Sequence, residues 1–166
     1  MSKENADKEQ KRSFKREVFS WIACIVVTIL LTEFILNFVI INANIPSGSM
    51  ENTIMTNDKL IALRTSYWFN DPKRGDIIIF KYPDDETEWF IKRVIALPGE
   101  TVLVKDGKVY INGSKKALSE PYIKEEPVED FGPYKVPKNG YFVMGDNRNN
   151  SNDAREWAVS YTHLRA

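Results

Sequence analysis

The chain has 166 residues, of which 43% are hydrophobic, and its 23 basic residues balance its 23 acidic ones. This length allows one domain with a substantial core, and the zero net charge argues against a nucleic-acid-binding protein, which needs a basic surplus. The single cysteine, Cys24, excludes an internal disulfide and a cysteine-rich zinc site. The single histidine, His163, lies near the end of the chain, which excludes most histidine-based mechanisms. We therefore expect no metal and no cofactor.

Residues 1–17 are polar and charged, and we expect them to form a disordered, basic tail. Residues 18–41 follow as an apolar segment that carries one formal charge after Trp21, at Glu33. A helix needs about 20 apolar residues to cross a bilayer, and a preceding basic cluster favours a cytoplasmic N-terminus. The sequence thus predicts a single-pass protein of the cell membrane, in contact with its lipid, with residues 42–157 on the extracytoplasmic side.

Two other interpretations of the apolar segment exist. A cleaved secretory signal also begins with basic residues, but its apolar stretch is shorter, at about 7–15 residues. A buried helix of a soluble protein would accommodate Glu33 more easily, because a carboxylate at mid-membrane costs roughly 2.5–3.5 kcal/mol on insertion scales. A protonated Glu33, or one that faces a second helix, would reduce this cost. The length of the segment favours the uncleaved anchor.

The chain after residue 42 has the texture of β structure. Asp106-Gly107 is a strong hairpin signal, because the two central residues of a type I′ turn need a positive φ. Residues 114–138, rich in Pro, Glu and Lys, are interpreted as a surface excursion. The predicted fold is mainly β, an antiparallel domain preceded by one transmembrane helix. The predicted strands are 76–80, 89–95, 101–104, 108–111 and 141–144.

Two serines flank a glycine directly after the apolar segment, in Ile45–Met50. Pro46 and Gly48 predict a tight bend there. An ordinary loop that leaves the membrane is the simpler interpretation of such a short stretch. Its position next to the bilayer makes it a candidate for catalysis, but a serine hydroxyl is a poor nucleophile until a base takes its proton.

Lys92 is the candidate base, because apolar residues surround it in the predicted strand 89–95. If its side chain points inward, burial disfavours the charged ammonium form and lowers its pKa. The alternative is a lysine on the solvated face of an edge strand.

The segment 145–155 is dense in Gly, Asn and Asp, which are turn-forming residues, so a polar loop is one interpretation. In a functional interpretation, Ser151 forms a hydrogen bond with the neutral Lys92 amine. Asp153 and Arg155 then hold the loop as supporting residues, although they could also be a surface ion pair of little energetic value.

Together these segments resemble the type I signal peptidases, membrane-bound serine proteases that remove signal peptides from exported preproteins. The resemblance covers roughly residues 15–157 and is closest to Gram-positive bacterial members with one N-terminal anchor. Each block alone is modest support, but their common order is specific. The four blocks are Pro46–Met50, Lys73–Phe80, Ile91–Glu100 and Gly145–Arg155.

The resemblance implies a role for each matching position. Ser49 matches the nucleophile, Lys92 the general base, and Ser47 the hydroxyl that lines the oxyanion hole together with the Ser49 amide. Ser151 matches the serine that orients the lysine, and Asp153 matches one member of a salt bridge behind it.

The remaining matches are supporting or pocket positions. Arg155 matches the other member of that salt bridge, and Asp146 and Arg93 match residues that support the site without reacting. Pocket residues for the small substrate side chains at −1 and −3 fall at Ile45, Ile79 and Ile91. The resemblance implies signal-peptide-bearing preproteins as partners, with no nucleic acid.

The chain departs from the family pattern at two places. Ala154 stands where the family usually has a second serine. Residues 158–166 do not match the family's closing strands, so we expect the chain to be incomplete there and its activity to depend on the missing part. Two other functions stay open: an inactive anchored β domain that binds peptides, and a soluble, self-cleaving Ser–Lys regulator, which the apolar segment disfavours.

Overall fold

The computed structural model describes residues 3–83, 85, 87–157 and 160–161. The chain divides into two compact units, Met1–Ile41 and Asn42–Ala166. His163 and most of the 158–166 tail lie outside the described residues. Within that tail, Ser160–Tyr161 forms the short strand β9.

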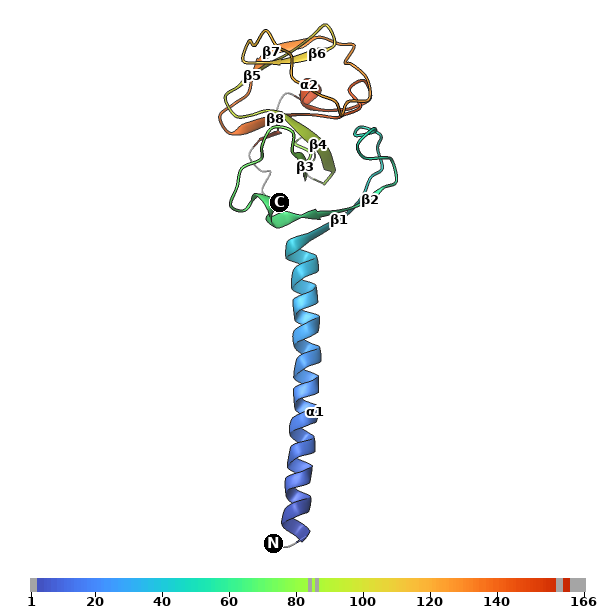
Figure 1. Ribbon diagram of the computed structural model, residues 1–166, viewed down its shortest axis with the longest axis vertical. Helices are drawn as coiled ribbons and strands as arrows, with labels where there is room; N and C mark the ends of the chain where they lie inside the picture. The colour runs from blue at the N-terminus through green and yellow to red at the C-terminus, as the bar shows by residue number, and fades with distance from the viewer. Residues whose placement is uncertain (1–2, 84, 86, 158–159, 162–166) are drawn as a thin grey trace. The chain divides into compact units, whose positions relative to one another are not determined.

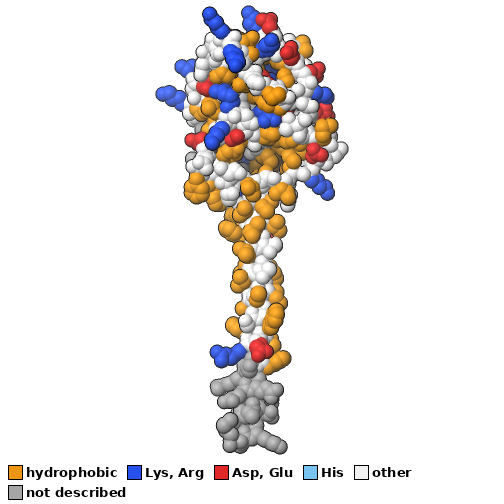
Figure 2. Space-filling view, viewed as in Figure 1, with side chains coloured by type: hydrophobic (Ala, Val, Ile, Leu, Met, Phe, Trp, Pro, Cys, Tyr) orange, Lys and Arg blue, Asp and Glu red, His pale blue; other side chains and the backbone are white. Residues whose placement is uncertain are grey.

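The first unit is a helix (Figure 1). It consists of α1 (Lys3–Phe34) and a π-helical turn, η1 (Ile35–Val39). Phe14–Val39 is long and apolar enough to cross a membrane, and none of its most apolar stretch is buried by the described chain. Figure 2 shows hydrophobic side chains along the visible face of this helix. This lack of burial is unlike the core helix of a soluble protein. The end of the apolar segment differs from the prediction, because Ile40 and Ile41 belong to strand β1.

The polar groups of this helix form hydrogen bonds within it. Asn37 Nδ2 donates to Glu33 Oε2 at 3.1 Å and to the Glu33 carbonyl oxygen at 2.8 Å. The hydroxyls of Thr28 and Thr32 donate to carbonyl oxygens four residues earlier. Each of these side chains therefore has a local partner, which lowers the cost of placing it in an apolar medium.

The second unit is mainly antiparallel β structure, as the sequence predicted, and its strands form three sheets. One sheet has the order β3-β4-β8-β9, a second has the order β6-β5-β7, and β1 pairs with β2. Two short helices complete the unit, η2 (Arg64–Tyr67) and α2 (Ala154–Trp157). The strands before β9 are β1 (Ile40–Asn44), β2 (Lys59–Leu63), β3 (Ile77–Lys81), β4 (Trp89–Ala96), β5 (Thr101–Lys105), β6 (Lys108–Ile111), β7 (Phe131–Lys135) and β8 (Gly140–Met144).

The hairpin between β5 and β6 turns where the sequence placed it. Asp106 and Gly107 have φ values of 50° and 74°, the positive values that a type I′ turn requires. Lys105 pairs with Lys108 across the turn. Because one slip in register would reverse the faces of every side chain, this turn keeps Val102, Val104 and Val109 in the core.

Strand β4 connects the main core to the site. Its C-terminal half pairs with β8 from Arg93 onward, whereas Trp89–Lys92 pair with β3 alone. Val94, Ile95 and Ala96 are fully buried there. The other half of β4 therefore keeps one edge free of β8.

The segment 114–138 differs from the predicted surface excursion in one respect. It contains β7, which pairs with β5, and near its end Val136 is a buried core residue. No apolar run in the sequence predicts this strand.

Candidate active site

The two side chains that the sequence paired are in contact. Lys92 Nζ and Ser49 Oγ share a hydrogen bond of 2.8 Å. Ser49 is 8% exposed and Lys92 is 4% exposed, so both groups are largely shielded from water. In the β3–β4 ladder Lys92 stands opposite Ile78, and its amine lies 5.0 Å from the centre of the Phe90 ring. The amine therefore sits in apolar surroundings next to a hydroxyl.

These surroundings change the acidity of the lysine. Burial lowers the pKa of Lys92 to about 8, against an opposing effect of the negative charge on Asp153. A pKa near this value leaves roughly a tenth of the amine neutral at pH 7, compared with less than a thousandth for an ordinary lysine. A neutral amine at hydrogen-bonding distance can accept the proton of the Ser49 hydroxyl.

The turn that carries Ser49 is held by an apolar cluster and by hydrogen bonds from Asn147. Met50, 1% exposed, anchors it in a small apolar cluster with Ile45 and Ile54. Asn147 holds the main chain of this turn. Its main-chain N–H donates to the Ser49 carbonyl oxygen at 3.0 Å, and its side-chain Nδ2 donates to the Gly48 carbonyl oxygen at 3.0 Å. Sequence reasoning missed Asn147, since asparagine in a polar loop looks like any other turn residue.

Ser47 lies beside Ser49. Its Oγ is 3.3 Å from Ser49 Oγ, and either hydroxyl can donate. A hydroxyl in this position can turn toward negative charge that develops on a bound carbonyl.

The hydrogen bond expected from Ser151 to the Lys92 amine is absent in the structure. Ser151 Oγ is buried and has no hydrogen-bond partner among the described residues. Its side chain lies against Gly145 instead, close enough that a Cβ added to Gly145 would come within 2.7 Å of Ser151 Cβ. The structure therefore does not contain the predicted contact between Ser151 and the Lys92 amine.

The expected salt bridge between Asp153 and Arg155 is present. Arg155 Nε donates to Asp153 Oδ1 at 2.9 Å and its Nη2 donates to Oδ2 at 2.9 Å. Asp153 is fully buried and also accepts the Gly145 amide at 3.0 Å. The pair therefore ties the end of the 145–155 loop to its start.

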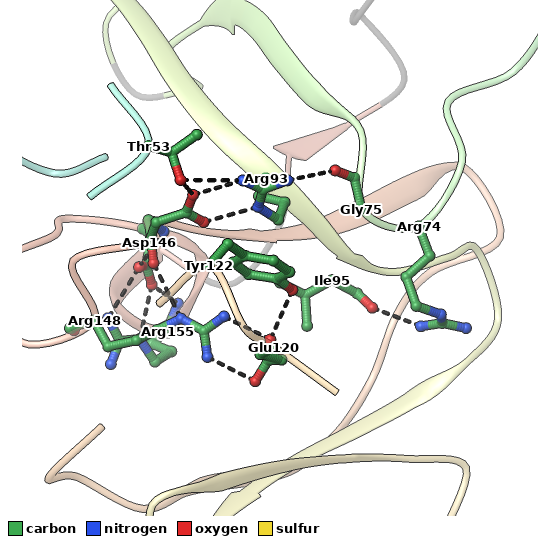
Figure 3. A network of polar contacts seen from close by, with 12 residues as sticks. Thr53, Arg74, Gly75, Arg93, Ile95, Glu120, Tyr122, Asp146, Arg148 and Arg155 are labelled. Carbon is green, nitrogen blue, oxygen red and sulfur yellow. Dashed lines mark hydrogen bonds and ion pairs between the residues drawn. The ribbon is translucent and has the colours of Figure 1, made fainter. Parts of the chain in front are cut away.

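A second buried pair joins Arg93 and Asp146 (Figure 3). Arg93 Nε and Nη2 donate to the two Asp146 oxygens at 2.8 and 2.6 Å. Arg93 Nη1 donates to the Gly75 oxygen at 2.8 Å, and the Thr53 hydroxyl donates to Asp146. Burial alone would lower the pKa of Arg93, but the hydrogen bonds and charge of Asp146 raise it, so the guanidinium stays charged. The pair thus joins strand β4, the loop before β3 and the start of the 145–155 loop.

The block Lys73–Phe80 also supports the fold. Arg74 pairs with Glu100 at 2.6 Å and donates to the Ile95 oxygen. Asp76 accepts the Lys73 amide at 2.9 Å and closes the turn before β3. These contacts link the loop before β3 to the end of β4.

A cavity of about 570 Å³ opens next to Ser49 and Lys92. It runs between residues 43–50 and the half of β4 that has no β8 partner. The three predicted pocket residues, Ile45, Ile79 and Ile91, all line it. Since Ile79 and Ile91 are direct cross-strand neighbours, they form one apolar wall of this cavity.

The described residues contain no group of three or more His, Cys, Asp or Glu side chains that could hold a metal ion.

Residues 18–163 match the model of one family, described as signal peptidase, peptidase S26. The match includes part of the tail in which we found no resemblance. The chain belongs to this signal peptidase family. Its members named signal peptidase I are membrane-anchored serine peptidases that act on exported preproteins, and the apolar helix α1 is consistent with that class.

Individual signal peptidases show the same relationship. A probable signal peptidase I-2 of Synechocystis sp. is 45% identical over 137 residues, which are 80% of this chain and 62% of the relative. Signal peptidase I of Bacillus amyloliquefaciens is 37% identical over 93% of this chain and 86% of its own length. A crystal structure of a signal peptidase I from Enterococcus faecalis is 36% identical and covers 56% of this chain and 92% of that one, with a TM-score of 0.49. The chain thus spans less than two thirds of the Synechocystis relative.

Proposed function

We propose that this chain is itself an active signal peptidase, a serine endopeptidase that removes signal peptides with Ser49 as nucleophile and Lys92 as general base. One observation carries the proposal: the Lys92 amine is buried, with a lowered pKa, at 2.8 Å from the Ser49 hydroxyl. A structural lysine in a β domain has no need of such a contact, because burying an ammonium group is costly.

The reaction follows from the positions of these groups. Ser49 Oγ attacks the scissile carbonyl carbon, and Lys92 takes the hydroxyl proton. The Ser47 hydroxyl and the Ser49 amide stabilise the negative oxygen of the tetrahedral intermediate. Lys92 returns the proton to the leaving amine as the carbon–nitrogen bond breaks, which leaves an ester on Ser49. Lys92 then takes a proton from water, whose oxygen attacks the ester carbon. As the bond from this carbon to Ser49 Oγ breaks, Lys92 passes the proton to Ser49 Oγ, which releases the carboxylic acid product and restores both the hydroxyl and the neutral amine.

The cavity supports the substrate class. In this proposal an extended peptide lies between residues 43–50 and the half of β4 that has no β8 partner, with alternate side chains toward Ile45, Ile79 and Ile91, which line the cavity. These branched side chains leave room for alanine-sized residues and overlap with larger ones. With the basic tail in the cytoplasm, the helix holds the β unit outside the membrane, where the cleavage points of signal peptides lie.

A cleavage assay tests the proposal. A precursor that carries a signal peptide is incubated with the full chain in lipid vesicles, and the mature product is followed by gel. We expect processing by the wild type and none by Ser49→Ala, because alanine has no nucleophile. Equal processing by both proteins would contradict the proposal. Binding of the precursor without cleavage by either would support the inactive peptide-binding domain.

The pH dependence of the same activity is a separate prediction. Below its pKa of about 8, Lys92 is charged and cannot accept a proton. We expect kcat/KM for a soluble peptide substrate to rise about tenfold per pH unit in the acidic range and to level off above pH 8. A rate measured from about pH 6 to about pH 10 checks this. A profile that keeps rising toward the ordinary lysine value would contradict a lowered pKa.

A further inference from the structure

A short segment outside the four sequence blocks contacts both parts of the site. We call residues 120–124 the strap. On one side it reaches the turn that carries Ser49: Asn52 Nδ2 donates to the Tyr122 oxygen at 3.0 Å, and Lys124 Nζ pairs with Glu51 Oε2 at 2.7 Å. The Lys124 pair is partly exposed, so its contribution is small.

On the other side the strap is attached to the start of the 145–155 loop. The main-chain N–H of Lys124 donates to the main-chain carbonyl oxygen of Asp146 at 3.1 Å. The Tyr122 ring lies 3.9 Å from the guanidinium carbon of Arg93, and the Tyr122 hydroxyl donates to Glu120 at 3.0 Å. Figure 3 shows that Tyr122 lies between the Arg93–Asp146 pair and Glu120.

Glu120 is the main attachment of the strap. Its two oxygens accept Arg148 Nη1 and Nη2 at 3.0 and 2.6 Å, and the side chains of Glu120 and Arg148 are 6% and 0% exposed. A buried guanidinium that loses its carboxylate is strongly unfavourable, because neither water nor another anion replaces the partner. The position of Arg148 therefore depends on the Glu120 carboxylate beside it.

Arg148 in turn holds the main chain of residues 145–148, which contacts the turn that carries Ser49. Its Nε donates to the Gly145 oxygen at 3.1 Å, and its own carbonyl oxygen accepts from Arg155. Asn147, the preceding residue, donates to the Ser49 oxygen at 3.0 Å. A shift of Arg148 is thus transmitted through one residue to the turn that holds Ser49.

We propose that Glu120 is a positioning residue for the Ser49–Lys92 pair, which acts through Arg148 and Asn147 and not through contact with substrate. This inference rests on the proposed peptidase function. A displacement of about 1 Å at a reacting atom lowers rates by roughly 100-fold. Loss of Glu120 should therefore lower kcat rather than weaken substrate binding.

The test compares Glu120→Gln with Glu129→Gln. Glu129 is an exposed carboxylate that lies in the segment 114–138 but outside the strap, so the two changes are chemically matched. Both are assayed with a soluble peptide substrate well below the unfolding temperature of each variant. For Glu120→Gln we expect kcat to fall about 10- to 100-fold with KM changed less than about twofold. For Glu129→Gln we expect wild-type values. An unchanged kcat in Glu120→Gln would overturn the inference.

A double variant separates positioning from stability. In Glu120→Leu/Arg148→Met both buried charges are removed. The free energy of unfolding should therefore rise from that of Glu120→Gln toward or beyond that of the wild type, while kcat should stay low. Recovery of kcat together with stability would show a merely structural role.

Amide hydrogen exchange gives a readout independent of cleavage. We expect faster exchange at residues 145–149 in Glu120→Gln than in Glu129→Gln. Unchanged exchange there would refute the inference even if the enzyme is active. Absence of cleavage by the wild type, with faster exchange in Glu120→Gln, would instead locate the failure in the proposed function.

Discussion

Replacing Lys92 by methionine is expected to abolish cleavage and, at pH 7, to make the protein more stable. Methionine has a similar length but no amine, so Ser49 loses its base. The gain in stability follows from the pKa of Lys92, which is about 8 in the folded chain and 10.5 as the reference value for the unfolded one. The folded state therefore binds a proton less readily than the unfolded state, and folding is penalised below pH 8 by up to about 3 kcal/mol.

The sign of this effect is checked by denaturation at two pH values. Between pH 8 and pH 10.5 the unfolded state still binds the proton and the folded state does not, so the penalty disappears as the pH rises. Urea unfolding should show Lys92→Met to be more stable than the wild type at pH 7, with a smaller difference at pH 10. Lys105→Met, at an exposed position in β5, serves as the control and should show no such trend. An equal difference at both pH values would contradict burial of a titrating amine.

Replacing Gly145 by alanine is expected to lower cleavage about 100-fold. The added Cβ would overlap Ser151 Oγ and the main-chain oxygen of Ser49. A side chain can rotate away, but the Ser49 oxygen is fixed by its hydrogen bond from Asn147. The nucleophile must therefore move, and overpacking of this kind also costs about 1–3 kcal/mol of stability.

A second substitution distinguishes the two overlaps. In Gly145→Ala/Ser151→Gly the overlap with the serine side chain is gone, while the overlap with the Ser49 oxygen remains. We expect the double variant to be more stable to heat than Gly145→Ala alone. Its kcat should stay as low as that of Gly145→Ala and well below that of Ser151→Gly alone. Full recovery of kcat would mean that Gly145 matters only for the space it leaves to Ser151.

The regular strands could be predicted because their sequences combine apolar runs with clear turn signals. Asp106-Gly107 is an example, since few other dipeptides adopt two positive φ values at so little cost. Strand β7 was missed because Gly132 and Pro133 lie in its centre, and both residues are typical of loops. Strand β1 was missed in part because Ile40 and Ile41 continue the apolar run of the helix without a break.

The contact between Ser49 and Lys92 could be predicted, as could the Asp153–Arg155 salt bridge, but the contacts of Glu120 could not. Ser49 and Lys92 lie in recognisable local patterns, whereas Glu120 and Arg148 meet only through the fold and lie 28 residues apart in sequence. The Ser151 contact shows the same limit, because sequence gives the presence of a hydroxyl but not its rotamer. Nothing in the residues around Glu120 distinguishes it from the exposed carboxylates of the same segment.

The proposed mechanism depends on the pKa of the Lys92 amine. An NMR titration of the Lys92 amine, with lysine labelled at Nζ and Lys92→Met used to assign its signal, measures this acidity directly. We predict a midpoint at about pH 8, well below the signals of the exposed lysines. A midpoint at the ordinary lysine value would mean that the amine is charged at neutral pH and solvated, and that it does not serve as the base for Ser49.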